Sequence, residues 1–226
     1  EAVPVEQVRP HGISQQELHE INQRLIAESK AVAAVVALRA AGYDFDMCGT
    51  DLIDKLTVDN GMVGLPDGMR YRLLVLPQTR FMTPKLAEKV RALVRDGAIL
   101  LAPKPELSPS LAGYPDCDAA VQKIADEVWG ASTPATAGER RFGKGCIIWG
   151  RKPLQTLQQM NIAADCIASD TKVPITFIHR TSNDADIYFV SHQDDSSRMT
   201  EVFFRISDVT CFINKGFELG YSDFSG

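Results

Sequence analysis

Two pairs of aspartates offer the most direct chemistry in this sequence. Asp44 and Asp46 alternate with aromatic residues in YDFD, so a strand there would place both carboxylates on one face. Their α-carbons would lie roughly 6.5–7 Å apart, and glycoside hydrolysis needs two carboxyl groups about 5–9.5 Å apart. The alternative is structural, because aspartates beside a turn also bind backbone N–H groups. Asp184 and Asp186, around a β-turn, pose the same choice.

Two histidines could also act together. His179 in FIHR and His192 in VSHQ each end a strand-like run, and cross-strand histidines can share a metal ion. A hydrogen-bonded structural role is the interpretation we favour, since no histidine stands at a metal-finger spacing from a cysteine. The cysteines form no C-x-x-C motif, and we interpret them as unpaired, mostly buried thiols, with a single disulfide left open: Cys48, Cys117, Cys146, Cys166 and Cys211.

The sequence contains no motif for nucleotide binding or for a serine nucleophile, and its charge does not favour nucleic-acid binding. There is no G-x-G-x-x-G, no G-x-x-x-x-G-K-[ST] and no G-x-S-x-G motif. The glycines of Gly143-Lys144-Gly145 precede a strand-like run, so we interpret them as a turn. The net charge of −5 and the absence of a basic stripe argue against nucleic-acid binding. No apolar run approaches the roughly 20 residues that cross a membrane, and the first residues do not form a signal peptide.

The first two thirds of the chain alternate helical and strand-like patterns. A capping box at Ser14 and Glu17 begins a long helix over 15–40, apolar nearly all round and therefore expected to be buried, with Gly42 as its C-cap. Two turn signals, Asp59-Asn60-Gly61 and Pro66-Asp67-Gly68, surround a small hairpin. Shorter elements are also expected: a strand at 43–45, a helix at 51–56 capped by Thr50 or Asp51, a helix at 153–160.

The clearest unit is strand–helix–strand. A buried strand over 71–76 is followed by a helix that begins at Thr83-Pro84 and ends at Asp96-Gly97, and AILLA at 98–102 is the second buried strand. A helix over 118–129, a polar connector over 130–140 and a third strand in CIIWG follow. This order predicts an α/β fold with a mostly parallel sheet.

From residue 174 the pattern changes to strands with hairpin-sized connections. ITFIHR, ADIYFVSHQ and MTEVFFRI are joined by short polar turns, which predicts antiparallel β structure. We therefore expect a boundary near 165–173, with an α/β domain over 1–168 and a partial β-rich segment over 169–226.

A flavodoxin-like α/β fold raises the question of amidotransferase chemistry. Such enzymes would have a nucleophilic cysteine just after a strand such as AILLA, where this chain has Pro103-Lys104-Pro105. A lysine between prolines does not replace a thiolate with a nearby base. The sequence therefore argues against that activity.

Several stretches, in this order, resemble the middle region of the α-L-rhamnosidases of glycoside hydrolase family 106. The similarity covers roughly residues 40–206 and rests on the combination, since no single motif is specific. The stretches are YDFDMCGTDLI, LPDGMRYRLLVLPQTRFMTPKLAEKVRALVRDGAILLAPKPELSPSLAGYPDCD, IADEVWG, GKGCIIWG and FIHRTSNDADIYFVSHQ.

The resemblance implies more than the patterns do. It implies a large enzyme that hydrolyses terminal α-L-rhamnose with inversion, in which a (β/α)₈-type catalytic domain carries two glutamates and calcium. This chain would be the amidotransferase-like, three-layer α/β domain that follows, with the first strands of a β-domain. None of the matching motifs contains the catalytic glutamates, so we assign this chain no catalytic, cofactor-binding or metal-binding residue and expect it to be inactive alone.

The expected partners are the neighbouring domains of the parent enzyme, whose substrate is a rhamnose-containing glycan; the resemblance also suggests a periplasmic or secreted protein. No strand precedes the long helix, and SDVTCFINKGFELGYSDFSG departs from the family pattern. Both ends are therefore expected to be cuts, or frame-altered or foreign sequence.

Two other functions stay open. The chain could be a stand-alone carbohydrate-binding module that uses exposed aromatic residues such as Tyr114, Trp129 or Trp149, although core packing is expected for both tryptophans. It could also be a small hydrolase that uses Asp44 and Asp46.

Overall fold

The computed structural model describes residues 33–110, 112–132, 136–182, 185–192 and 199–206. The chain divides into two compact units, which we call unit 1, ending at Ala164, and unit 2, beginning at Asp165. The domain limits expected from the sequence, 1–168 and 169–226, stay a prediction. No helix in the described ranges is long and apolar enough to cross a membrane.

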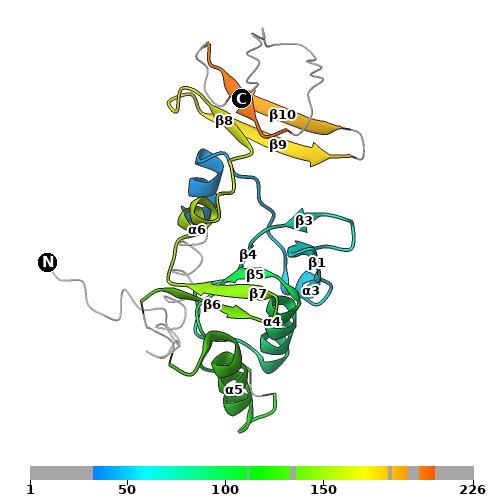
Figure 1. Cartoon of the computed structure of the whole chain (residues 1–226), viewed down its shortest axis with the longest axis vertical. Coiled ribbons are helices and arrows are strands. Elements are labelled where there is room, and N and C mark those ends of the chain that lie inside the picture. The colour runs from blue at the N-terminus through cyan, green and yellow to red at the C-terminus, as the bar shows by residue number, and fades with distance from the viewer. Residues whose placement is uncertain (1–32, 111, 133–135, 183–184, 193–198, 207–226) are drawn as a thin grey trace, which may run out of the picture. The chain divides into compact units, whose positions relative to one another are not determined.

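Unit 1 is built on a four-stranded, mostly parallel sheet (Figure 1). Its order is β4-β5-β7-β6, in which the first three strands are parallel and β6 is antiparallel to β7. The described chain is therefore mixed α/β, as expected. The strands are β4 (Leu74–Val75), β5 (Ile99–Leu101), β6 (Gly138–Phe142) and β7 (Gly145–Trp149).

Helix α4 (Pro84–Asp96) connects β4 to β5 and confirms the predicted strand–helix–strand unit. The hydroxyl of Thr83 accepts a hydrogen bond from the backbone N–H of Leu86 at 3.3 Å, and Pro84 occupies the first helical position, where no N–H is needed. Gly97 ends the helix with φ 128°, a conformation that side chains disfavour. Local sequence signals therefore determine both ends of α4.

Helix α5 (Cys117–Trp129) precedes a hairpin that the sequence did not reveal. Residues 130–140 read as a polar connector, but 138–142 form β6, which turns at Gly143 and Lys144 into β7. Among the described residues no strand pairs with the outer edge of β6, and its middle residues are polar and exposed, as is common in edge strands. Arg140 from β6 donates to the carbonyl of Val128 at 3.0 Å, which satisfies the end of α5.

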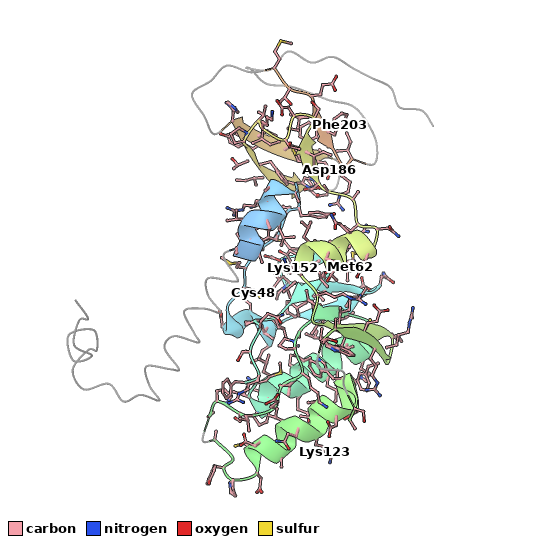
Figure 2. All side chains as sticks on the ribbon, turned by 90° about the vertical axis from the view of Figure 1, so that its left-hand side faces the viewer. Cys48, Met62, Lys123, Lys152, Asp186 and Phe203 are labelled. Atoms are coloured by element: carbon pink, nitrogen blue, oxygen red, sulfur yellow. The ribbon has the colours of Figure 1, made fainter. Side chains whose placement is uncertain are left out.

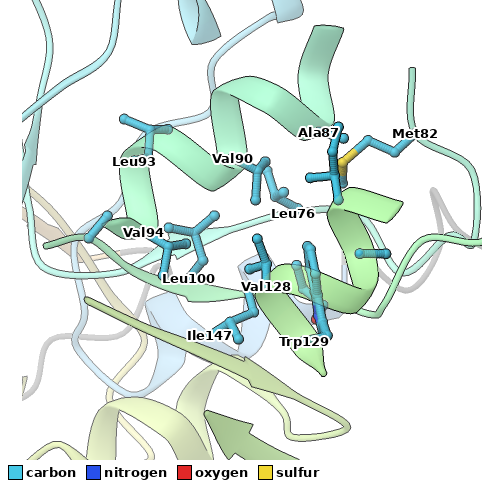
Figure 3. Packing of buried hydrophobic residues seen from close by; sticks show 14 of the residues in the cluster. Leu76, Met82, Ala87, Val90, Leu93, Val94, Leu100, Val128, Trp129 and Ile147 are labelled. Carbon is cyan, nitrogen blue, oxygen red and sulfur yellow. The ribbon is translucent and has the colours of Figure 1, made fainter. Parts of the chain in front are cut away.

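The core of unit 1 lies between this sheet and the two helices α4 and α5 (Figure 3). The helices contribute a face of fully buried side chains at helical spacing, among them Val90, Val94 and Val128, and the sheet contributes Leu100 and Ile147. The neighbouring strand residues Leu101 and Ile148 point to the other face and are also buried, at 0% and 4% exposure. Both faces of the sheet centre are therefore covered, as parallel strands require.

The predicted excursion is a three-stranded antiparallel sheet of β1 (Thr57–Asp59), β2 (Met62–Gly64) and β3 (Arg70–Tyr71). Asn60 and Gly61 join β1 to β2 with φ 50° and 77°, the positive values that a tight two-residue hairpin turn requires. The expected continuous strand over 71–76 is wrong, because the run divides between β3 in this sheet and β4 in the parallel one.

Three other local predictions need correction. Residues 43–49 form neither helix nor strand. Helix α3 (Thr50–Ile53) is only four residues long, and Gly49 is its N-cap without a side-chain bond, in place of Thr50 or Asp51. Residues 33–40 are helical and end at Gly42 as expected, with φ 77°, but this part is largely exposed, with Val36 at 61%. The remainder of the predicted 15–40 helix lies outside the described residues. Helix α6 (Pro153–Gln159) agrees with the prediction.

Unit 2 contains two antiparallel pairs, which confirms antiparallel β structure. Strands β9 (Ile175–Thr181) and β10 (Asp186–His192) form the predicted hairpin. Strand β11 (Val202–Phe204) pairs with β8 (Cys166–Ala168) and not with β10. Strand β8 could not be predicted, because a three-residue strand is too short to show alternation.

Candidate functional site

One carboxylate organises the polar side chains of unit 2. Asp165, just before β8, is 1% exposed. Its Oδ2 lies 2.9 Å from Nδ1 of His179, and its Oδ1 accepts from Nη2 of Arg205 at 3.0 Å and from the hydroxyl of Tyr188 at 3.1 Å. With Asp186, these residues form what we call the Asp165 cluster, which lies wholly within unit 2.

Asp186, labelled in Figure 2, binds the other side of the histidine ring. Its Oδ1 lies 2.9 Å from Nε2 of His179 and accepts from the hydroxyl of Thr181 at 2.9 Å. The hydrogen bond from His179, reinforced by that of Thr181, lowers the pKa of Asp186. His179 therefore lies between two carboxylates.

Ring stacking fixes the histidine further. The ring of His179 stacks on Tyr188, its cross-strand partner, with centroids 4.1 Å apart and planes 9° apart. Tyr188 contacts Phe204 of the other strand pair at a centroid distance of 4.7 Å. Burial, and then the charge of Asp165, raise the pKa of Tyr188. Burial, and then Asp165, also raise the pKa of the Cys166 thiol to about 11.

Thr181, His179 and Asp165 contact one another in the sequence expected of a catalytic triad. Thr181 would be the nucleophile, His179 its general base, and Asp165 the acid that orients the base. The hydroxyl of Thr181 lies 3.3 Å from Nε2 of His179, whereas nucleophilic catalysis requires that nitrogen to accept the hydroxyl proton. Asp186 lies closer to Nε2, at 2.9 Å, and also accepts from the same hydroxyl. The base position is therefore occupied by a second carboxylate, and the geometry is that of a structural cluster.

The aspartates proposed from the sequence as a catalytic pair have structural partners. Asp44 accepts from the backbone N–H of Phe45 at 3.0 Å, as the turn interpretation predicts. Asp46 accepts from the hydroxyl of Tyr71 at 2.6 Å; burial, and then this bond, raise the pKa of Tyr71. Because residues 43–49 do not form a strand, the prediction that Asp44 and Asp46 lie on one face of a strand is wrong.

Of the other proposed pairs, the two histidines are not brought together, and the pair of Asp184 and Asp186 stays a prediction. His179 is paired with Tyr188 across the hairpin and His192 with Ile175, so the histidines are not cross-strand neighbours. They lie on the same face four positions apart, roughly 13–14 Å along the strand. Asp184 lies outside the described residues. Across the described ranges, no three His, Cys, Asp or Glu side chains are grouped to hold a metal ion.

Of the three aromatic residues considered for sugar binding, the two tryptophans are buried, as predicted, and the tyrosine is exposed. Trp129 is 1% exposed and donates from Nε1 to the carbonyl of Ala102 at 3.1 Å, and Trp149 is 7% exposed. Tyr114 is 72% exposed. Only Tyr114 of the three candidates is therefore accessible to a sugar. The four described cysteines are free thiols, and the Cys211 position lies outside the described residues.

Unit 1 also has a shallow groove of about 340 Å³ after the end of β5. The amine of Lys104 binds Oδ1 of Asp126 at 2.6 Å and the carbonyl of Gly130 at 2.7 Å. Gln122 donates to the carbonyl of Glu106 at 3.1 Å. These donors are engaged within the protein, which leaves the groove little to offer a polar ligand. Its lining is Lys104, Pro105, Glu106, Leu107, Gln122 and Asp126.

No motif in the sequence points to Asp165, Tyr188 or Arg205 as members of a site. A partial signal was present, because the turn at 182–185 places Thr181 opposite Asp186 and therefore His179 opposite Tyr188. Asp165 and Arg205 could not be found this way, since the pairing of β8 with β11 joins segments far apart in the chain.

Comparison with known proteins supplies the class of this protein. Over 172 residues, or 76% of the chain, it is 36% identical to a Formosa agariphila protein provisionally named beta-glucuronidase. The rhamnosidase structure from Novosphingobium sp. PP1Y matches 69% of the chain at 28% identity with a TM-score of 0.60. The fold and these similarities define an α/β and β segment of the kind found in large glycoside hydrolases.

The family follows from a direct match. The sequence model of the α-L-rhamnosidases, glycoside hydrolase family 106, matches residues 26–213, and the chain belongs to this family. The parts of this chain that match the two relatives correspond to only 14% of the Formosa protein and 15% of the Novosphingobium enzyme. The chain therefore spans about one seventh of the length of the relatives it matches.

Proposed function

We propose that this chain is a non-catalytic accessory segment of a glycosidase that removes terminal α-L-rhamnose from glycans. The observation that carries the proposal is the family match over a region equal to one seventh of each relative. The aspartates considered for catalysis support it, since Asp46, Asp165 and Asp186 are bound to side chains of this same chain.

Unit 1 would be the amidotransferase-like α/β domain of that enzyme. An amidotransferase-like, three-layer arrangement is consistent with three parallel strands in the order β4-β5-β7 and with burial on both faces of the sheet centre. Lys104, at the position where an amidotransferase would carry its nucleophile, is held by Asp126 and Gly130. The domain would therefore act as a scaffold.

Contacts with neighbouring domains would account for the outer surface of unit 2. Ile178, Ile187 and Phe189 occupy one face of the β9–β10 hairpin and are 51%, 59% and 69% exposed. A sheet with apolar side chains on both faces is usually covered on both. The calcium ion that the resemblance implies does not fit the described residues, which offer no group of three metal-binding side chains, so we assign it to other polypeptide.

Activity measurements on the chain test this proposal. We expect no turnover of a chromogenic α-L-rhamnoside, and none of a β-glucuronide, the substrate that the Formosa protein's provisional name suggests. Turnover abolished by Asp46→Asn but kept in Asp59→Asn, an exposed aspartate on β1, would contradict the proposal and favour the small-hydrolase alternative.

The exposure of Tyr114 keeps a sugar-binding module as the second candidate. Titration calorimetry with L-rhamnose and with a rhamnose-containing oligosaccharide separates the two functions. An accessory segment gives no saturable heat. Saturable binding that Tyr114→Ala removes and Tyr114→Phe retains, because the aromatic face is kept, would establish the binding module.

A further inference from the structure

The Asp165 cluster connects both strand pairs of unit 2. Asp165 precedes β8 and Arg205 follows β11, whereas His179 belongs to β9 and Asp186 to β10. A two-stranded pair is marginally stable by itself in water. The bonds from Asp165 to His179 and Tyr188 therefore link the β9–β10 hairpin to the β8–β11 pair.

Both ring nitrogens of His179 face carboxylate oxygens at 2.9 Å. A carboxylate only accepts hydrogen bonds, and a neutral imidazole carries a single N–H, so it can satisfy one of these contacts but not both. Only the doubly protonated ring donates to Asp165 and Asp186 together. We infer that His179 is a proton-dependent link in unit 2, which joins the two strand pairs while both ring nitrogens are protonated and weakens when one proton leaves.

The charges around the ring agree with this inference. Two carboxylates, Asp165 and Asp186, face the ring with one guanidinium, that of Arg205. The hydroxyls of Tyr188 and Thr181 are neutral, the thiol of Cys166 adjoins Asp165, and a second guanidinium, that of Arg180, donates to the backbone carbonyl of His179 at 3.0 Å. Among the side chains bound to the ring or to its two carboxylates, a charged His179 makes the positive and negative charges equal. Its neutral form leaves an excess negative charge where the side chains of His179 and Asp165 are 14% and 2% exposed, which is unfavourable.

The direction of the pH effect follows from proton binding. If the folded unit holds a proton between the two carboxylates that the unfolded chain releases, stability falls as the pH rises. On the acid side, the lowered pKa of Asp186 means that its contribution is present above the ordinary aspartate range and is lost as the pH falls through its folded pKa. The link is therefore complete only between these two limits.

Nitrogen-15 NMR of the unmodified chain tests the protonation state without a substitution. At pH 7 we expect both ring nitrogens of His179 to show the shifts of protonated nitrogens. A shift typical of an unprotonated nitrogen at either position would overturn the inference.

Amide hydrogen exchange tests the consequence for stability. From pH 6 to pH 8, the protection of the β9 and β10 amides, normalised to free-peptide rates, should fall about tenfold, since one pH unit of coupled proton release changes the opening equilibrium tenfold. In Asp186→Asn the side-chain amide can donate to Nε2, so a neutral His179 suffices and the fall should disappear. His192→Gln, at the other end of the same face, should keep it. A fall of equal size in all three proteins, or none in the unmodified chain, would overturn the inference.

Discussion

Unit 1 buries a continuous set of apolar side chains between a sheet and two helices, whereas unit 2 concentrates its hydrogen bonds around Asp165. In unit 2 the described residues that are buried are Asp165, Cys166 and Val173. Large exposed apolar side chains are frequent there, at Ile167, Ile178, Ile187, Phe189, Met199, Phe203 and Ile206.

The difference shows two sources of structural specificity. Apolar packing in unit 1 is nearly independent of pH and tolerates changes on the surface. The Asp165 cluster depends on geometry and protonation, because each donor needs its acceptor and an unpaired buried polar group is costly. We therefore expect the two units to respond to different perturbations.

Removing a core side chain should have the largest effect. Leu100 is 0% exposed on the central strand β5, so Leu100→Ala should lower the free energy of unfolding by about 2–5 kcal/mol. Both tryptophans of the chain, Trp129 and Trp149, belong to unit 1, so urea unfolding followed by tryptophan fluorescence reports on this unit. Val75→Ala, at 41% exposure on neighbouring β4, is the control and should change the value by less than about 0.5 kcal/mol. Equal losses in the two variants would contradict the position of the core.

Removing the central carboxylate should come next. Asp165→Ala leaves donors on His179, Tyr188 and Arg205 without their acceptor, at a cost of about 1–3 kcal/mol. Faster amide exchange in β9 and β10, with an unchanged tryptophan-monitored transition, is the expected result. Asp170→Ala is the matched control, since Asp170 is exposed and accepts from the backbone N–H of Lys172 at 2.9 Å. A shift of the tryptophan transition in Asp165→Ala would contradict the separate stabilisation of the two units.

The same contrast explains what could be predicted from sequence. The elements of unit 1 follow from local signals: Thr83-Pro84 and Gly97 define α4, and the apolar spacing of Val90 and Val94 identifies its buried face. The division of 71–76 between two sheets could not be predicted, because it depends on which distant strand pairs with each end of the run. Local signals and long-range pairing therefore separate the correct predictions from the incorrect ones.

In unit 2 the hairpin was predictable and its partners were not. The short polar turn after Thr181 determines the register of β9 and β10. Asp165 acquires its importance only when β8 and β11 come together, and the sequence around it, AADCIA, reads as an ordinary apolar stretch. The exposure of the apolar residues Ile178, Ile187 and Phe189 could not be predicted, because alternation alone does not tell which face of a hairpin is covered.

High pH should destabilise each unit through the ionisation of one tyrosine, Tyr71 in unit 1 and Tyr188 in unit 2. The pKa of Tyr71 is raised by burial and then by Asp46, and that of Tyr188 by burial and then by Asp165. The folded form then keeps a proton that the unfolded chain loses above about pH 10, so stability is present below that pH and falls as the pH rises further. Spectrophotometric titration should show these phenols ionising with unfolding, and Tyr71→Phe and Tyr188→Phe should each remove one late-ionising group. Ionisation of both in the ordinary tyrosine range, with the fold intact, would contradict the two hydrogen bonds.

A substitution on the outer face of the hairpin should have the smallest effect on stability. Phe189 is 69% exposed and lies directly opposite Ile178, which is 51% exposed. Phe189→Thr keeps a residue that favours strands and should change the free energy of unfolding by less than about 0.5 kcal/mol. It should nevertheless reduce binding of the dye ANS, which reports accessible apolar surface.

The opposite face of unit 2 provides the contrast for that measurement. Phe204 contacts Tyr188 and therefore the Asp165 cluster, so Phe204→Thr should accelerate amide exchange in β9 and β10 and should increase dye binding. If Phe189→Thr destabilised unit 2 as much as Phe204→Thr, the outer face of the hairpin would be part of a core. The apolar surface assigned to contacts with neighbouring domains would then already be occupied within this chain.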